Sequence, residues 1–563
     1  MKNTLIRLYA GIVSLLFGIV FSAQILSFTG LYRAWIAIPI TLIVIVLAYI
    51  AYMRSGKTWF EALSPQESPS HLLSNTILLT CIIIVLTVFL QRLVLWHVST
   101  AGQAVSIDFA NYHSIKVFQL LRDGSNWNLA IPYGQYPSAY ESLIAFGMFF
   151  TGDIRITGTV HALIVLSFWL TMALLIVRYS KLSIDVSLLL ALAICFMPII
   201  FPQAMNVGKN DMLLSLTVLM AICHAPVGDE RFHAIGLAFA TMLSLATKAT
   251  GLYILFYLWG LVMLNWYRHF RKNSWQDYLH PAMFLLVIAL MFPGGLWVIR
   301  NYLVLGNLFT WEITTFFQTS IFANLDNPVL YNSPRSYFIY NAAGLIIVAI
   351  IAALFHKRLR WQMAGTVLVI ALTFVVTPLS AFLTINNLDY LDVQWRFVMH
   401  GIVILWVIAI VLASPLIRWM YARVVSQKHL CYVASILVVL AIPVLMTGIG
   451  VDDIFSYNAT QWEKMEDPTL QDDSVYDILE TLDPGTIYIE NIAWLPLMIR
   501  NPGLNITELR YPLGQADVYP VPDIDYIAFA SIYLDEPSST IYTLDEWELI
   551  FEHETGKIYQ RSP

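Results

Sequence analysis

The chain consists largely of long apolar runs, many of which exceed the roughly 18 residues that cross a bilayer as a helix. Hydrophobic residues make up 58% of the 563 residues, and charged residues only 12%. A soluble domain of this size carries about twice that charged fraction. Lys and Arg are scattered through loops without a basic face, which argues against nucleic-acid binding. The pattern therefore predicts an α-helical polytopic protein that is integral to a membrane.

The apolar runs divide into about thirteen predicted transmembrane helices. These spans are 8–28, 34–53, 72–95, 157–178, 183–203, 211–226, 232–247, 249–266, 281–299, 337–355, 361–383, 396–414 and 430–449. Two basic residues precede the first run, but no small-residue cleavage site follows it, so we interpret it as a retained helix. We predict three parts: two N-terminal helices in 1–70, a transmembrane core in 71–450 with a loop at 97–156, and a separate domain in 451–563.

Basic residues in short loops predict which side of the membrane each loop faces, because they favour the cytoplasm. With the N-terminus inside, alternation of the spans places five further basic loops inside as well. These loops are at residues 54–57, 178–181, 268–272, 357–360 and 418–428. Counting the short stretch 136–150, which contains Glu141, as a span would reverse this pattern, so we interpret it as a re-entrant or interfacial helix. We expect a plasma or inner membrane location and an extracytoplasmic C-terminal domain.

The C-terminal domain has a different composition from the rest of the chain. Its pattern predicts a helix at 474–482, strands at 486–490 and 526–530, and a hairpin within 549–559. We therefore expect a small α/β domain. Elsewhere, the four cysteines lie within or at the edge of apolar runs and lack metal-ligand spacing. We interpret them as small core residues rather than disulfide partners or zinc ligands.

Polar residues gather in the first large loop, which lies between two apolar parts of the chain. Asp108, Tyr112 and Lys116 follow one another at intervals of four residues, and His113 lies beside them. This spacing predicts a short amphipathic helix on the membrane surface that presents these side chains together. The alternative is an ordinary solvated loop with interfacial aromatic residues such as Tyr136.

Ionisable residues also stand at the ends of later spans. Asp211 begins a span and is interpreted either as a helix cap or as a functional acid, because a charge at membrane depth usually has a partner. Lys248 separates two short spans, and the alternatives are a functional cation or a lysine that extends to the interface. Arg300 with Asn301 and, later, Arg396 suit phosphate binding, since a guanidinium pairs well with phosphate oxygens.

In this order the residues resemble the GT-C superfamily of lipid-carrier-dependent glycosyltransferases, especially the branch of protein O-mannosyltransferases and the lipid A aminoarabinose transferase. The resemblance covers about residues 72–563. It rests on Asp108, Tyr136-Pro137, Asp211, Lys248, Trp297-x-x-Arg300-Asn301-Tyr302 and Gly306-Asn307. The chain departs from the family pattern in two ways. Two extra spans come first, and no second acidic residue adjoins Asp108, which puts metal dependence in doubt.

The resemblance implies transfer of a sugar from a polyprenyl-phosphate donor to an acceptor hydroxyl at the outer face, with inversion expected. It assigns Asp108 as the base, and Asp211 as a ligand of the sugar, of the acceptor or of a cation. Three cations would hold the lipid phosphate: Lys248, Arg300 and Arg396. Further substrate contacts are expected from Tyr112, His113, Tyr136, Glu141 and Asn301. A divalent cation, Mg²⁺ or Mn²⁺, stays open, with Asp108, Asp211 and His113 as its ligands if it binds.

Two other functions remain open at the level of sequence. One is a transporter or flippase of a lipid-linked glycan intermediate, which shares the demand for buried charges. Such proteins place polar groups near the bilayer midplane, whereas here the charges stand at the ends of spans. The other is a non-catalytic factor in glycan assembly. The sequence does not identify the sugar, and the acceptor is a glycan, a lipid or a protein.

Overall fold

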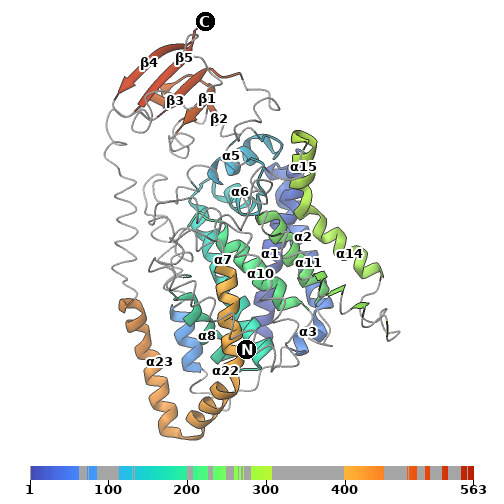
Figure 1. Ribbon diagram of the computed structural model, residues 1–563, viewed down its shortest axis with the longest axis vertical. Coiled ribbons are helices and arrows are strands. Elements are labelled where there is room, and N and C mark those ends of the chain that lie inside the picture. Colours follow the sequence, from blue (N-terminus) through green and yellow to red (C-terminus); the bar gives the residue numbers. More distant parts are fainter. Residues whose placement is uncertain are drawn as a thin grey trace, which may run out of the picture.

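A computed structural model shows a helical bundle with a small sheet beyond one end of it (Figure 1). The model describes residues 2–62, 73, 75–84, 109, 113–129, 131, 134–197, 200, 207–225, 233–248, 251, 259–260, 262–263, 266–267, 271, 281–306, 399–448, 478–479, 481–490, 501, 503–507, 523–529, 547–553 and 556–562. The predicted spans 337–355 and 361–383, and most of 249–266, lie outside these residues. The end of the bundle nearest the sheet is called the sheet end below.

The helices confirm the α-helical fold that the apolar runs predict. Those of the bundle and of its loops are α1 (Lys2–Phe28), α2 (Ala34–Ser55), α3 (Lys57–Ala62), α5 (Ser114–Asp123), α6 (Ala139–Thr151), α7 (Ile156–Ser180), α8 (Ile184–Cys195), α10 (Asp211–His224), α11 (Ala234–Thr247), α14 (Pro281–Met291), α15 (Leu296–Leu305), α22 (Met399–Ser426) and α23 (Lys428–Gly448). Within the described chain, five helical segments are long and apolar enough to cross a membrane. These segments are Thr4–Phe28, Ala34–Ser55, Ile156–Ser180, Ala282–Leu305 and Met399–Ser426. The chain is therefore an integral membrane protein.

The first two helices pack against each other but lie in different environments. In the most apolar window of α1, 72% of residues are buried, against 17% in that of α2. Helix α1 is therefore interior, and also contacts α6, α7 and α11, whereas α2 turns apolar side chains such as Leu42 and Ile43 outward. Gly18 permits the close approach of the pair, because its missing side chain makes room for Ile45 of α2.

The predicted span 281–299 lies within one helical segment, Ala282–Leu305, which changes to a 3-10 turn in its middle. A short 3-10 segment, Phe292–Gly295, separates α14 from α15, and α15 continues to Leu305. Pro293 has no backbone N–H to continue the helical ladder. A side chain on Gly294 would meet the backbone carbonyl oxygen of Met242 on α11 at 2.5 Å. The Pro-Gly-Gly sequence thus coincides with a tighter 3-10 turn at which the chain packs closely against α11.

The short apolar stretch 136–150 forms a helix, α6, at the sheet end (Figure 1). It packs against α5 on one side and against α1 and α7 on others. Both α5 and α6 end at a glycine with positive φ, Gly124 and Gly152, each at 65°. Glycine is favoured at this left-handed position, because the Cβ atom of any other residue would come too close to the backbone. The two helices form a compact layer over the ends of the longer helices.

The C-terminal domain contains a five-stranded mixed sheet. Its strands are β1 (Gly485–Glu490), β2 (Leu504–Thr507), β3 (Tyr526–Phe529), β4 (Trp547–His553) and β5 (Gly556–Arg561), in the order β2-β1-β3-β5-β4. Strands β2, β1 and β3 run parallel, and β5 pairs antiparallel with β3 and with β4. The predicted strands β1 and β3 and the β4–β5 hairpin are confirmed. Strand β2 was not predicted. Only part of the predicted helix 474–482 is described.

All four cysteines are buried and free, as the apolar context of each one predicts. They lie at Cys81, Cys195, Cys223 and Cys431. Each of them therefore fills space in the helical bundle and contributes no covalent cross-link.

We predict that Gly18→Ala destabilises the protein and that Gly11→Ala does not. A Cβ atom at Gly18 would lie 2.5 Å from Ile45 Cγ1 and 3.0 Å from its backbone nitrogen, so α2 must move. Overpacking of this kind costs about 1–3 kcal/mol. Gly11 lies on the same helix and has nothing within 4 Å of its Cβ position. Thermal unfolding in detergent would measure both variants, and equal melting temperatures would contradict the close packing of α1 and α2.

Candidate functional site at the sheet end

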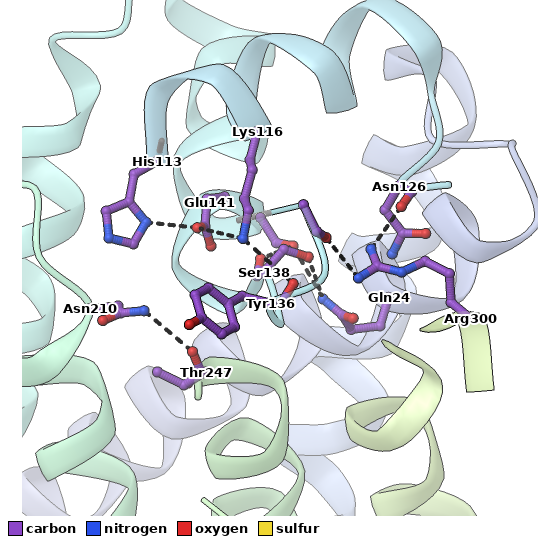
Figure 2. Close-up of polar contacts among 12 residues, drawn as sticks. Gln24, His113, Lys116, Asn126, Tyr136, Ser138, Glu141, Asn210, Thr247 and Arg300 are labelled. Atoms are coloured by element: carbon purple, nitrogen blue, oxygen red, sulfur yellow. Dashed lines mark hydrogen bonds and ion pairs between the residues drawn. The ribbon is translucent and has the colours of Figure 1, made fainter. Parts of the chain in front are cut away.

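A buried cluster of charged side chains lies between α5 and α6 (Figure 2). His113 Nδ1 donates a hydrogen bond to Glu141 Oε1 over 2.7 Å, and Lys116 Nζ lies 3.9 Å from the same oxygen. His113 and Glu141 are each 1% exposed, and Lys116 is 7% exposed. A carboxylate out of water is stable only with such partners. The Glu141 carboxylate thus holds α5 onto α6.

The cluster changes the protonation of its members. Burial lowers the pKa of Lys116 to about 8, and the Arg300 guanidinium lowers it while Glu141 opposes the change. Burial acts to raise the pKa of Glu141, but His113 and Lys116 outweigh it, so that pKa lies below its usual value. Glu141 is therefore an anion at neutral pH. The pKa of Lys116, about 8, lies close to neutral pH, so a small rise in pH removes its proton.

The interpretation of this loop as an ordinary solvated segment is wrong. Helix α5 begins at Ser114, so only Lys116 of the four residues whose spacing predicts a helix lies within it, and the helix packs against α6. Lys116 also approaches Tyr136, with its Nζ 3.5 Å from the backbone carbonyl and 5.6 Å from the ring centre. Asp108 and Tyr112 lie outside the described residues, so their place in the site stays a prediction.

Asp211 and Lys248 form an ion pair at the sheet end of α10 and α11. Asp211 is 3% exposed, and the Lys248 side chain is 22% exposed. Asp211 was interpreted as a possible helix cap, and Lys248 as a possible lysine that extends to the interface. Neither interpretation is complete, because each residue has the other as a charged partner. Asn210 adds a second link, since its Nδ2 donates to the carbonyl of Thr247 over 3.3 Å (Figure 2).

Arg300 is buried and holds the loop that precedes α6. Its Nη1 donates to the carbonyl of Asn126 over 2.7 Å, and its Nη2 to that of Gly134 over 2.8 Å (Figure 2). The neighbouring Asn301 donates from Nδ2 to the carbonyl of Gln135 over 2.9 Å. Bonds to backbone carbonyls leave no mark in a sequence, so this anchoring role was not predicted. Phosphate binding by Arg300 stays a prediction, as does that by Arg396, which lies outside the described residues.

Three side chains that complete the site were not assigned to it from the sequence. Lys116 was considered only as part of the helical spacing, Tyr140 only as one of the interfacial aromatic residues, and Gln24 not at all. Gln24 on α1 reaches Ser138 Oγ over 3.3 Å at the start of α6 (Figure 2). The Tyr140 hydroxyl accepts a hydrogen bond of 3.1 Å from the backbone N–H of Gly208. Tyr140 thereby connects the Glu141 cluster to the segment that leads into Asp211.

In the part of the chain that the structure describes, no group of three or more His, Cys, Asp or Glu side chains is arranged to hold a metal ion. Asp108 lies outside that part. The predicted cation site of Asp108, Asp211 and His113 therefore stays a prediction.

No protein-family model matches the chain, and no curated protein matches it significantly. Among solved structures it is similar to ArnT from Cupriavidus metallidurans bound to undecaprenyl phosphate, with 15% identity and a TM-score of 0.49. The apo state of the same protein gives 14% identity and a TM-score of 0.44. Each comparison covers 86% of this chain and 97% of the other. ArnT is a lipid A aminoarabinose transferase of GT-C fold, the branch that the order of residues resembles.

At this identity and TM-score, the likeness assigns no activity, substrate or site residue to this chain. The assignment of a function therefore depends on the chemistry of the residues at the sheet end.

We predict that Glu141→Gln destabilises the protein by about 3–5 kcal/mol, because it leaves the buried Lys116 ammonium without its carboxylate. Asp123→Asn is the matched control, since Asp123 pairs with Arg122 in a partly exposed position and such pairs contribute about 0–1 kcal/mol. Thermal unfolding of the purified variants would measure the difference. Equal losses in both variants would contradict a stabilising role of the buried cluster.

We predict that Lys116 makes stability depend on pH in the alkaline range. Its pKa is about 8 in the folded protein, against 10.5 for a free lysine. Between pH 8 and pH 10.5, Lys116 binds more protons in the unfolded chain than in the folded protein, so the free energy of unfolding rises with pH. Below pH 8, the effect of Lys116 on the free energy of unfolding is constant. Wild type should gain roughly 1–3 kcal/mol relative to Lys116→Met between pH 8 and pH 10.5. If the difference in unfolding free energy between the two proteins stayed constant from pH 8 to pH 10.5, the lowered pKa would be ruled out.

Proposed function

We propose that this protein is a glycosyltransferase that moves a sugar from a polyprenyl-phosphate donor to an acceptor hydroxyl at the outer face of the membrane. One observation carries the proposal: charged residues, most of them buried, collect at the sheet end of an apolar helical bundle. Lys116, Glu141, Asp211 and Arg300 are buried, and Lys248, which pairs with Asp211, is partly exposed (Figure 2 shows Lys116, Glu141 and Arg300). Ionisable groups at membrane depth are costly and usually mark a functional site.

The position of these charges along the helices favours an enzyme over a transporter. Asp211 is the first residue of α10, and Lys248 directly follows the last residue of α11. Both charges therefore stand at helix ends, where the phosphate of a lipid carrier lies, and away from the bilayer midplane that transporters use. A carrier phosphate can reach this depth while its polyprenyl chain stays in the hydrocarbon.

Asp108 is the proposed base, and Asp211 its partner in binding the sugar or acceptor. The acceptor oxygen gives its proton to the Asp108 carboxylate as it forms a bond with the anomeric carbon. The bond between that carbon and the donor phosphate oxygen breaks, and the lipid phosphate leaves with the electron pair. Attack opposite the leaving group inverts the anomeric centre. In support, Phe109, which follows Asp108 in the chain, packs against Gly208 in the segment before Asp211.

Lys248 is the proposed main ligand of the departing phosphate, whose negative charge grows during the reaction. Its side chain is the more exposed member of the pair with Asp211, and an ammonium carries three donors, so it can bind a phosphate oxygen and a carboxylate together. Arg396 is proposed as a second ligand. Arg300, with both terminal nitrogens on loop carbonyls, contributes positive charge and holds the loop in place. His113, Tyr136, Glu141 and Asn301 remain proposed neighbours of the substrate.

We predict that Asp108→Asn lowers sugar transfer by about 10²–10⁴-fold, because the acceptor loses its base. Purified protein in nanodiscs would receive a panel of polyprenyl-phosphate sugars with candidate acceptors, and release of the lipid phosphate would be followed. Asp153→Asn is the control, since Asp153 pairs with Arg155 in a partly exposed position at the start of α7. Binding of the lipid phosphate itself should survive in both variants.

Each outcome of this experiment separates the functional classes. Release from one donor, lost in Asp108→Asn and kept in Asp153→Asn, supports the transferase and identifies its donor. Equal release by both variants would remove Asp108 from the role of base. If the wild-type protein released lipid phosphate from none of the donors, a flippase or a glycan assembly factor would be favoured over a transferase.

A further inference from the structure

Helix α5 is buried on two opposite faces, which is unusual for a ten-residue helix in a loop. Residues three or four apart share a helix face. His113, Lys116, Val117 and Leu120 accordingly face α6 and the bundle core. Ile115 lies on the opposite side of the helix and is only 2% exposed. Something other than the bundle must therefore cover Ile115.

The C-terminal sheet provides that cover. Ile115 and Ile131, both in the loop 97–156, share one buried cluster with residues of the C-terminal domain. Those residues are Leu479, Ile487, Ile489, Leu504, Tyr526, Ala528 and Ile558. Successive residues of a strand point to opposite faces, and Tyr488 and Ile527 belong to a separate cluster on the other face. One face of the sheet is thus docked on the loop.

The loop is also held by the helical bundle. Arg300 of α15 binds the carbonyls of Asn126 and Gly134, which lie before and after Ile131 in the chain. The segment around Ile131 is therefore anchored by α15 as well as by the sheet, and α5 packs against both α6 and the C-terminal domain. Figure 1 shows the sheet above α5 and α6 at this end of the molecule.

We propose that the C-terminal sheet positions the part of the loop that carries α5 and Ile131. By docking on Ile115 and Ile131, the sheet holds α5 against α6 and keeps Lys116 and His113 in the site. Ile115 and Ile131 are positioning residues, because they act through Lys116 and His113 and touch no substrate. The C-terminal domain is then part of the active-site scaffold. The effect on turnover rests on the proposed function, whereas the effect on the placement of Lys116 does not.

The accessibility of Lys116 tests the clamp without any enzymatic assay. The variant is Ile131→Asp, which places a charge in the apolar cluster at a distance along the chain from Lys116. Full-length protein in nanodiscs would be treated with an amine-reactive reagent, and modification of each lysine would be followed by mass spectrometry. We expect Lys116 to react at least about tenfold faster than in wild type, since it is buried only while α5 is docked.

Matched controls separate undocking from general unfolding. Ile550→Asp makes the same substitution on β4 at a side chain that is 37% exposed, and it should leave Lys116 protected. Modification of Lys248, which belongs to the ion pair with Asp211, should stay unchanged in Ile131→Asp. If that variant does not fold, the milder Ile131→Thr provides the same comparison. Equal reactivity of Lys116 in a folded variant and in wild type would overturn the proposal.

A double-mutant cycle tests whether the clamp acts on turnover through Lys116. Undocking should lower kcat by about 10- to 100-fold, the effect of a small misplacement of active-site groups, and leave the KM for the lipid donor within about twofold. In a Lys116→Met background, Ile131→Asp should cause a clearly smaller fold-loss of kcat than in wild type, because the effect through Lys116 is already absent. Independent, multiplicative losses, or an unchanged kcat despite an exposed Lys116, would overturn the positioning role. Absence of transfer in wild type would refute the proposed function, while the modification of Lys116 would still decide the clamp.

Discussion

A carboxylate removed from water costs several kcal/mol unless nearby cations and hydrogen bonds compensate. Glu141 is 1% exposed, and His113 and Lys116 from α5 supply that compensation. The arrangement of the sheet end follows from this requirement. Helix α5 must stay against α6 for the charge to be satisfied, and the sheet then covers the other face of α5 through Ile115. One buried charge thus connects the transmembrane bundle, the loop and the C-terminal domain.

The same requirement explains why the remaining polar groups of the sheet end occur in linked sets. Asp211 and Lys248 neutralise each other across α10 and α11. Arg300 satisfies the carbonyls of Asn126 and Gly134 in the loop between α5 and α6. Irregular backbone beside a membrane is tolerated where protein groups satisfy it. The residues proposed to bind substrate are therefore also the residues that give the site its shape.

Several elements could be predicted because their signal is local. Long apolar runs specify helices, and the alternating strands β1 and β3 and the β4–β5 hairpin show in the sequence. Two features could not be predicted for a common reason. The anchoring of loop carbonyls by Arg300 and the burial of Lys116 each depend on a neighbour far away in the chain. Apolar periodicity records which face of a helix is buried, not which segment covers it.

The sequence by itself determined that this chain is a helical membrane protein with a small α/β domain, because the cost of exposed backbone in lipid leaves an apolar run no other fold. It also placed Asp211 and Lys248 at the ends of helices, whereas Arg300, which was predicted at the end of a span, lies within α15. Only the tertiary structure decided the pairing of these charges and made Glu141 the centre of a buried cluster. Electrostatic partners are chosen by distance in space. His113 and Glu141, 28 positions apart, and Arg300 and Asn126, 174 positions apart, meet only after the helices pack.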